Sequence, residues 1–152
     1  MTVVEYGATA EELCALYREY GWWADRDPES VRRALQNTDE TVLVRDEAGD
    51  PVGAARILTD YVYYAMVYDV IVASDERGEG VGREVMAAVR DHPRLQDVAP
   101  SLLAREGLVP FYESCGFEVM DQDIEHPDGD PEPLSWMVHR RDDDGDNGAQ
   151  SA

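Results

Sequence analysis

The sequence contains no lysine, few cysteines and no long apolar run. All 13 basic residues of the 152-residue chain are arginines. Its two cysteines, Cys14 and Cys115, are too few for a disulfide scaffold, so we expect a reducing compartment, the cytoplasm. No apolar stretch approaches the ~20 residues that span a bilayer. The first residues show no signal peptide. The sequence therefore predicts a cytoplasmic protein without a membrane partner.

The charge balance is strongly acidic. With 33 acidic residues, the formal net charge is −20 at pH 7. Such a surface repels phosphate backbones and anionic lipids, so we expect no nucleic-acid or membrane partner. The acid-rich, lysine-free composition resembles that of extremely halophilic organisms, and we expect a halophilic archaeal source. Most acidic residues then reflect habitat rather than function.

Length and patterning predict one globular domain. The chain is about the length of a single domain, and its 43% of apolar residues suffices for a core. We expect the domain to span residues 1–140 and an acidic disordered tail to span 141–152. The predicted strands comprise residues 3–6, 41–44, 52–58, 66–73, 101–104, 117–120 and 134–139.

Helix signals separate these strands. Thr9 and Glu12 form a capping-box pattern for a first helix that we expect to end at Gly21. Pro28 marks the first turn of a second helix, which runs to about residue 36. A third helix follows residue 83 and runs to about residue 90, and a short fourth helix spans 108–115.

A glycine-rich loop joins the most apolar strand to the third helix. It reads Arg77-Gly78-Glu79-Gly80-Val81-Gly82-Arg83. Its glycines leave backbone N–H groups unobstructed at a helix N-terminus, a pattern typical of a pyrophosphate site. The loop matches neither the dinucleotide fingerprint nor the P-loop motif. On spacing alone, a plain strand-to-helix turn is an equal alternative.

Two motifs resemble those of the GNAT acyl-CoA N-acyltransferases. Residues 77–82 match the family signature R/Q-x-x-G-x-G/A, and residues 111–117, Phe-Tyr-Glu-Ser-Cys-Gly-Phe, resemble its second signature. Residues 52–56, 59–60 and 68–72 also look like the branch that contains plant serotonin N-acetyltransferases. The resemblance covers residues 3–139.

The resemblance implies a fold and a cofactor site. The fold class is α/β (α+β), with a mixed, mostly antiparallel twisted sheet and helices on both faces. The main chain of the central strand would pair with the pantetheine arm of acetyl-CoA, and the loop N–H groups would hold its pyrophosphate. The implied cofactor-binding residues are Val70, Ile71, Val72, Arg77, Gly78, Glu79, Gly80, Val81, Gly82 and Arg83.

Catalytic roles also follow from the resemblance. Tyr112 is the candidate general acid for the departing CoA sulfur, with packing of the last helix as the alternative. Asp69, an acid inside an apolar strand, is the candidate general base, because burial favours its protonated form. Its alternative role is structural. At the position where many family members carry Asn, this chain has Arg105, which puts one cofactor contact in doubt. The alternative is that Arg105 reaches a phosphate of the cofactor.

The predicted function is transfer of an acetyl group from acetyl-CoA to a primary amine by direct attack in a ternary complex. Trp23 and Tyr63 are the predicted acceptor-binding residues, with plain packing as the alternative. The acceptor is a small molecule, for example an aromatic amine or a polyamine. Alternatives are acetylation of a protein N-terminus or lysine, and a non-catalytic acyl-CoA-binding module. No metal is expected. The sequence does not decide whether the protein is a monomer or a homodimer.

Overall fold

The computed structural model describes residues 1–76, 78–120, 124–125, 131–133 and 135–141. Arg77 and most of the predicted tail therefore lie outside the described residues. The main sheet has five strands in the order β1-β2-β3-β4-β5. They are β1 (Val3–Glu5), β2 (Glu40–Arg45), β3 (Pro51–Thr59), β4 (Ala65–Val72) and β5 (Pro100–Ser101). Neighbours pair antiparallel from β1 to β4, and β4 pairs with β5 in parallel.

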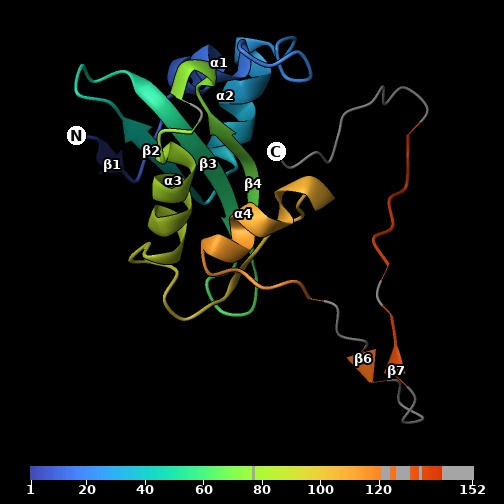
Figure 1. Ribbon diagram of the computed structural model, residues 1–152. Helices are drawn as coiled ribbons and strands as arrows, with labels where there is room; N and C mark the ends of the chain where they lie inside the picture. Colours follow the sequence, from blue (N-terminus) through green and yellow to red (C-terminus); the bar gives the residue numbers. More distant parts are fainter. Residues whose placement is uncertain (77, 121–123, 126–130, 134, 142–152) are drawn as a thin grey trace.

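Helices cover both faces of this sheet (Figure 1). One face carries α1 (Ala10–Tyr17) and α2 (Pro28–Gln36), and the other carries α3 (Val81–Arg90). A short helix, α4 (Val109–Ser114), follows a 3₁₀ turn, η2 (Glu106–Leu108), and lies beside α3, with contacts from Gly82 to Arg90. The predicted fold class, a mixed and mostly antiparallel sheet between helices, is confirmed.

Local signals position these helices as predicted. The Thr9 hydroxyl accepts a hydrogen bond from the Glu12 N–H, and the Glu12 carboxylate accepts one from the Thr9 N–H. Asp27 caps α2, with Pro28 in its first turn. Central strands supply the core, where Val42, Leu43 and Val44 are fully buried. None of the described helices is long and apolar enough to cross a membrane.

Two expected boundaries are wrong. Helix α1 ends at Tyr17 rather than at Gly21, because the chain then folds into successive turns that bury Tyr20 and Trp23. The strand expected at residues 101–104 is reduced to Pro100–Ser101. Pro100 has no N–H to donate, which shortens the possible ladder.

The two last predicted strands are not formed where the pattern places them. Residues 117–120 and 135–139 belong to no strand, and Leu134 lies outside the described residues. A separate two-stranded sheet pairs β6 (Ile124–Glu125) with β7 (Pro131–Glu132) instead (Figure 1). Alternating apolar residues favour a strand only where a neighbouring strand offers a ladder and a face to pack on, and β5 is too short to offer either.

Candidate functional site

The central strand β4 separates from its neighbour β5 after two residues. Their parallel pairing joins Ala65 to Pro100 and Met66 to Ser101 and then stops. Strand β4 continues to Val72, still paired with β3 on its other side. The far half of β4 thus has a strand edge without a ladder partner among the described strands. Such an edge can pair with an extended ligand.

A β-bulge lies in the same half of β4. Ala54 pairs with Ile71 but Arg56 pairs with Tyr68, so Asp69 and Val70 together stand opposite a single residue of β3. Asp69 has a φ of 55°, in the left-handed region that few non-glycine residues adopt. Bulges bend a strand and redirect its side chains, often beside a functional site. Here the bulge coincides with the separation from β5.

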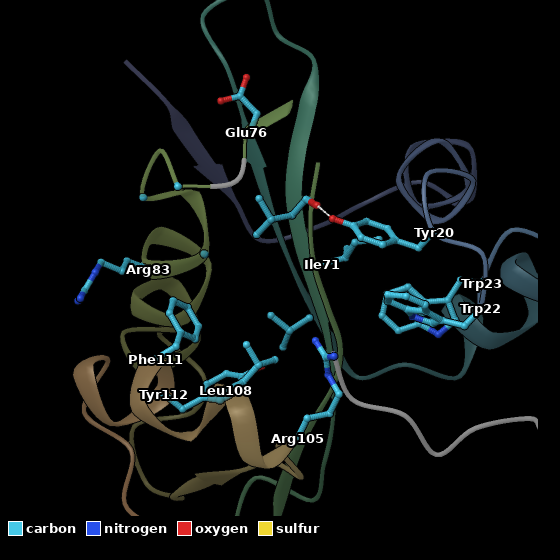
Figure 2. A pocket seen from close by; sticks show the side chains of 15 residues that line it. Tyr20, Trp22, Trp23, Ile71, Glu76, Arg83, Arg105, Leu108, Phe111 and Tyr112 are labelled. Atoms are coloured by element: carbon cyan, nitrogen blue, oxygen red, sulfur yellow. Dashed lines mark hydrogen bonds between the residues drawn. The ribbon is translucent and has the colours of Figure 1, made fainter. Parts of the chain in front are cut away.

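The separation opens a cavity of about 510 Å³ between β4, the start of α3, the η2–α4 segment and the turns after α1. Figure 2 shows the glycine loop and Glu76 at one end, Arg105 at the opposite end, and the tryptophans facing Leu108 and Tyr112 across the space. The lining residues are Tyr20, Trp22, Trp23, Val70, Ile71, Val72, Glu76, Gly78, Gly80, Gly82, Arg83, Arg105, Leu108, Phe111 and Tyr112.

The glycine loop forms a wall made of main chain. Gly80 precedes the first residue of α3 with a φ of 85°, and no side chain caps the helix. A Cβ on Gly80 would meet no atom within 4 Å, so the loop faces open space. Unsatisfied N–H groups at a helix start, together with the positive end of the helix dipole, favour an anion. Arg83 adds a positive charge to this wall, and Glu76 opposes it.

Most predicted cofactor residues meet in this cavity. Seven of the sequence-predicted set line it, whereas Glu79 and Val81 do not, and Arg77 lies outside the described residues. Val81 is instead buried in the core. The seven lining residues are Val70, Ile71, Val72, Gly78, Gly80, Gly82 and Arg83.

Helix α4 brings Tyr112 to the opposite wall. Its side chain is only 4% exposed, and burial raises the pKa of Tyr112 to about 12, so the phenol stays protonated at neutral pH. The ring of Phe111 packs edge-on against it, with centroids 5.1 Å apart. Two arginines of α3 hold α4 in place: Arg83 donates to the Ser114 carbonyl and Arg90 to the Cys115 carbonyl.

Asp69 lies outside the cavity lining, on the side of the sheet that α1 covers. Its carboxylate is buried and forms ion pairs with Arg26 at 2.9 Å and with Arg56 at 2.8 Å. The Tyr17 hydroxyl is the third partner and donates a hydrogen bond to this carboxylate at 3.4 Å. Burial acts to lower the pKa of Arg26, but the hydrogen bond to Asp69 and its charge raise it above the usual value. The four side chains form a charged cluster in which Asp69 and Tyr17 are buried and the two arginines are half-buried.

The two predicted acceptor residues lie apart. Trp23 lines the cavity and is buried, whereas Tyr63 is 78% exposed on the loop between β3 and β4 and does not line it. Sequence reasoning missed Tyr20, whose hydroxyl donates to the Val72 carbonyl and joins the turns after α1 to β4. It also missed Leu108 and the arginine partners of Asp69, for which no sequence motif exists. Within the described part of the chain, no three His, Cys, Asp or Glu side chains cluster as metal ligands would.

Comparison with known proteins agrees with this geometry. Residues 10–128 match the model of the acetyltransferase (GNAT) domain family. The chain is 39% identical over 103 residues to serotonin N-acetyltransferase 2, chloroplastic, from rice, covering 64% of this chain and 50% of the rice protein. It is 30% identical over 111 residues to an uncharacterized N-acetyltransferase of the red alga Gracilaria tenuistipitata, covering 70% of this chain and 58% of that protein. The chain thus spans half to three-fifths of these relatives.

A solved structure shares the fold. The GNAT family acetyltransferase from Streptococcus pneumoniae superposes with a TM-score of 0.68 at 23% identity, covering 92% of this chain and all of that one. The family match extends over most of the chain, from α1 through the glycine loop and α4. The chain therefore belongs to the GNAT acetyltransferase family.

Proposed function

We propose that this protein transfers the acetyl group of acetyl-CoA to the primary amine of a small molecule by direct attack in a ternary complex. The observation that carries the proposal is one cavity in which the free edge of β4, the glycine loop and Tyr112 meet. When bound, acetyl-CoA supplies the acetyl group as a thioester. Neither cysteine lines the cavity, which supports direct attack over transfer through an enzyme thiol.

The cavity walls fit acetyl-CoA. A Cβ on Gly82 would lie 3.0 Å from the Phe111 ring, so a larger residue there would displace this ring from its place in the cavity wall. The open loop at Gly78 and Gly80 can hold a diphosphate with main-chain N–H groups. The edge of β4 at Val70 and Ile71 can pair with the amide groups of a pantetheine arm, whereas the Val72 carbonyl already accepts a hydrogen bond from Tyr20.

Tyr112 is the proposed general acid. Attack of the amine nitrogen on the thioester carbon breaks the carbon–sulfur bond, and Tyr112 donates its phenolic proton to the departing sulfur. A main-chain N–H near Val70, in the bulge of β4, would hydrogen-bond the carbonyl oxygen as negative charge develops on it. The amine nitrogen loses one proton to water, and the Tyr112 phenolate takes one proton back from water, so the products are the amide and the free thiol with no net gain or loss of protons.

The sequence-based role of Asp69 as the base stays part of the proposal. Its oxygens already accept hydrogen bonds from Arg26, Arg56 and Tyr17. Few lone pairs are left for an amine, so a water molecule would have to relay the proton. A structural role accounts for the same contacts.

A transfer assay at high salt tests the proposal. We expect acetyl-CoA consumption with small amines, and initial-rate lines that intersect, as a ternary complex requires. The rice relative's name makes serotonin the first amine to try, and Trp22 and Trp23 in the cavity support an aromatic acceptor. Acetylation of peptides but of no small amine would favour a protein substrate. Tight acetyl-CoA binding without any transfer would favour a binding module.

A further inference from the structure

Arg105 is placed differently from the other arginines around the site. Arg26 and Arg56 share Asp69, Arg94 pairs with Glu40, and Arg83 donates to the Ser114 carbonyl. Within the described residues, no carboxylate pairs with Arg105. In a chain with 33 acidic residues, an arginine that lines a cavity without an acidic partner is available for a ligand.

The position of Arg105 assigns it to the acceptor end. Figure 2 shows it at the end of the cavity away from the glycine loop, with its guanidinium directed into the space between Leu108 and the tryptophans. Tyr112 lies near enough for the charge of Arg105 to oppose the rise in the phenol's pKa. A phosphate held by the glycine loop would lie at the other end. Arg105 is thus beside the general acid and away from the diphosphate.

We propose that Arg105 binds the carboxylate of an acceptor that also carries the reacting amine, so the acceptor is an aromatic amino acid or a similar amine with a carboxylate. This inference rests on the proposed function and names its substrate class. A guanidinium fork matches the two oxygens of a carboxylate. The aromatic wall of Tyr20, Trp22 and Trp23 would contact the ring.

The charge around the cavity favours this class over polyamines. Arg105 directs its charge into the space, and the single lining acid, Glu76, lies at the opposite end, so a ligand with several ammonium groups would find no acidic partner beside Arg105. The surface as a whole carries −20. A zwitterionic amino acid has no net charge, so that surface does not repel it, and inside the cavity its carboxylate meets the guanidinium of Arg105.

Calorimetry on matched ligand pairs tests the proposal. The full chain at high salt, saturated with CoA, is titrated with tryptophan and with tryptamine, which differ only in the carboxylate. Tyrosine and tyramine form a second pair. We expect the carboxylate-bearing member to bind about tenfold tighter. Arg105→Gln should remove that difference while changing tryptamine binding less than about twofold.

Controls separate this result from others. Arg33→Gln changes another exposed arginine, on α2 and outside the cavity lining, and should keep the carboxylate preference. Arg105→Lys keeps the charge but loses the fork and should restore the preference only in part. Equal binding of both members by the wild type, or an undiminished difference in Arg105→Gln, would overturn the proposal, as would no binding of either amine to the CoA complex.

The same titrations distinguish a failure of the carboxylate-binding role of Arg105 from a failure of the proposed acetyltransferase function. Acetyl-CoA should bind the wild type and Arg105→Gln with equal affinity, because Arg105 lies away from the glycine loop. Weaker acetyl-CoA binding in Arg105→Gln would assign the residue to the cofactor and overturn the inference. Failure of acetyl-CoA to bind the wild type would refute the proposed function itself, and the carboxylate preference would then be measured on the free chain.

Discussion

The two ends of the cavity are built from different parts of the polypeptide. The glycine-loop end is mostly main chain: N–H groups at the start of α3 and the free edge of β4. The opposite end consists of side chains from three segments, namely the turns after α1, the η2 segment and α4. Main chain can bind a diphosphate whatever the surrounding residues are, whereas an acceptor is recognised by particular side chains. We therefore expect the glycine-loop end to bind the cofactor through main-chain groups that the family shares, and the opposite end to determine which acceptor binds.

Closing the main-chain end should have the largest effect. Gly80→Trp places a bulky side chain on the loop at a φ of 85° and should weaken acetyl-CoA binding by at least about a hundredfold. Gly49→Trp is the matched control, because Gly49 has a φ of 88°, faces open space and lies in the turn between β2 and β3. Calorimetry should show near wild-type affinity for that control. Equal weakening in both variants would point to strain rather than to a lost anion site.

Removing one hydroxyl from the side-chain end should affect turnover but not cofactor binding. Tyr112→Phe should lower kcat about a hundredfold, because no other group replaces the proton donor to sulfur. Its dissociation constant for acetyl-CoA should stay within about twofold, since the ring still packs on Phe111. Tyr64→Phe removes a hydroxyl from a residue that is largely exposed outside the cavity and should leave kcat unchanged. An unchanged kcat in Tyr112→Phe would remove the phenol from the mechanism.

A substitution of Asp69, in the charged cluster with Arg26, Arg56 and Tyr17, tests whether this residue is a general base or a structural residue. Asp69→Asn keeps the side-chain shape, and asparagine tolerates the left-handed φ of 55°. It leaves Arg26 and Arg56 without a counter-charge, so the free energy of unfolding should fall by about 2–4 kcal/mol in denaturant titration. The base role predicts, in addition to this loss of stability, a large loss of kcat in the folded variant, whereas a purely structural role leaves kcat of the folded variant near the wild-type value. Both quantities are measured on the same sample.

Alkaline pH should give the smallest effect. The pKa of Tyr112 lies at about 12, above its unfolded value of 10, so the folded state holds this proton more tightly. Its contribution to stability is complete below pH 10 and is lost as the pH rises through about 12. Tyr112→Phe should remove up to about 2 kcal/mol of the decline in unfolding free energy between pH 10 and 12. Burial also raises the pKa of Tyr17, so Tyr17 still contributes part of the decline in unfolding free energy in both proteins. An identical decline in both proteins would contradict the assignment.

The sequence predicts the main-chain end better than the side-chain end, for a physical reason. Gly78 and Gly80 follow a buried strand and precede α3, Gly82 lies in the first turn of α3, and that local order suffices to place their main chain at the cavity wall. The positions of Tyr20, Arg26 and Arg56 depend on how distant segments pack, which no local pattern encodes. Residues 117–120 and 135–139 show the same limit, because their alternation signals a strand but not a partner for it. Trp23 and Tyr63 have similar local settings, yet only Trp23 reaches the cavity.

The most direct measurement of the central claim is the titration of the wild-type chain with acetyl-CoA at high salt. We expect one molecule to bind per chain with micromolar affinity, through the loop at Gly80 and the free edge of β4. A folded wild-type chain that shows no binding would contradict the account, because a cavity of this form would then have lost its ligand.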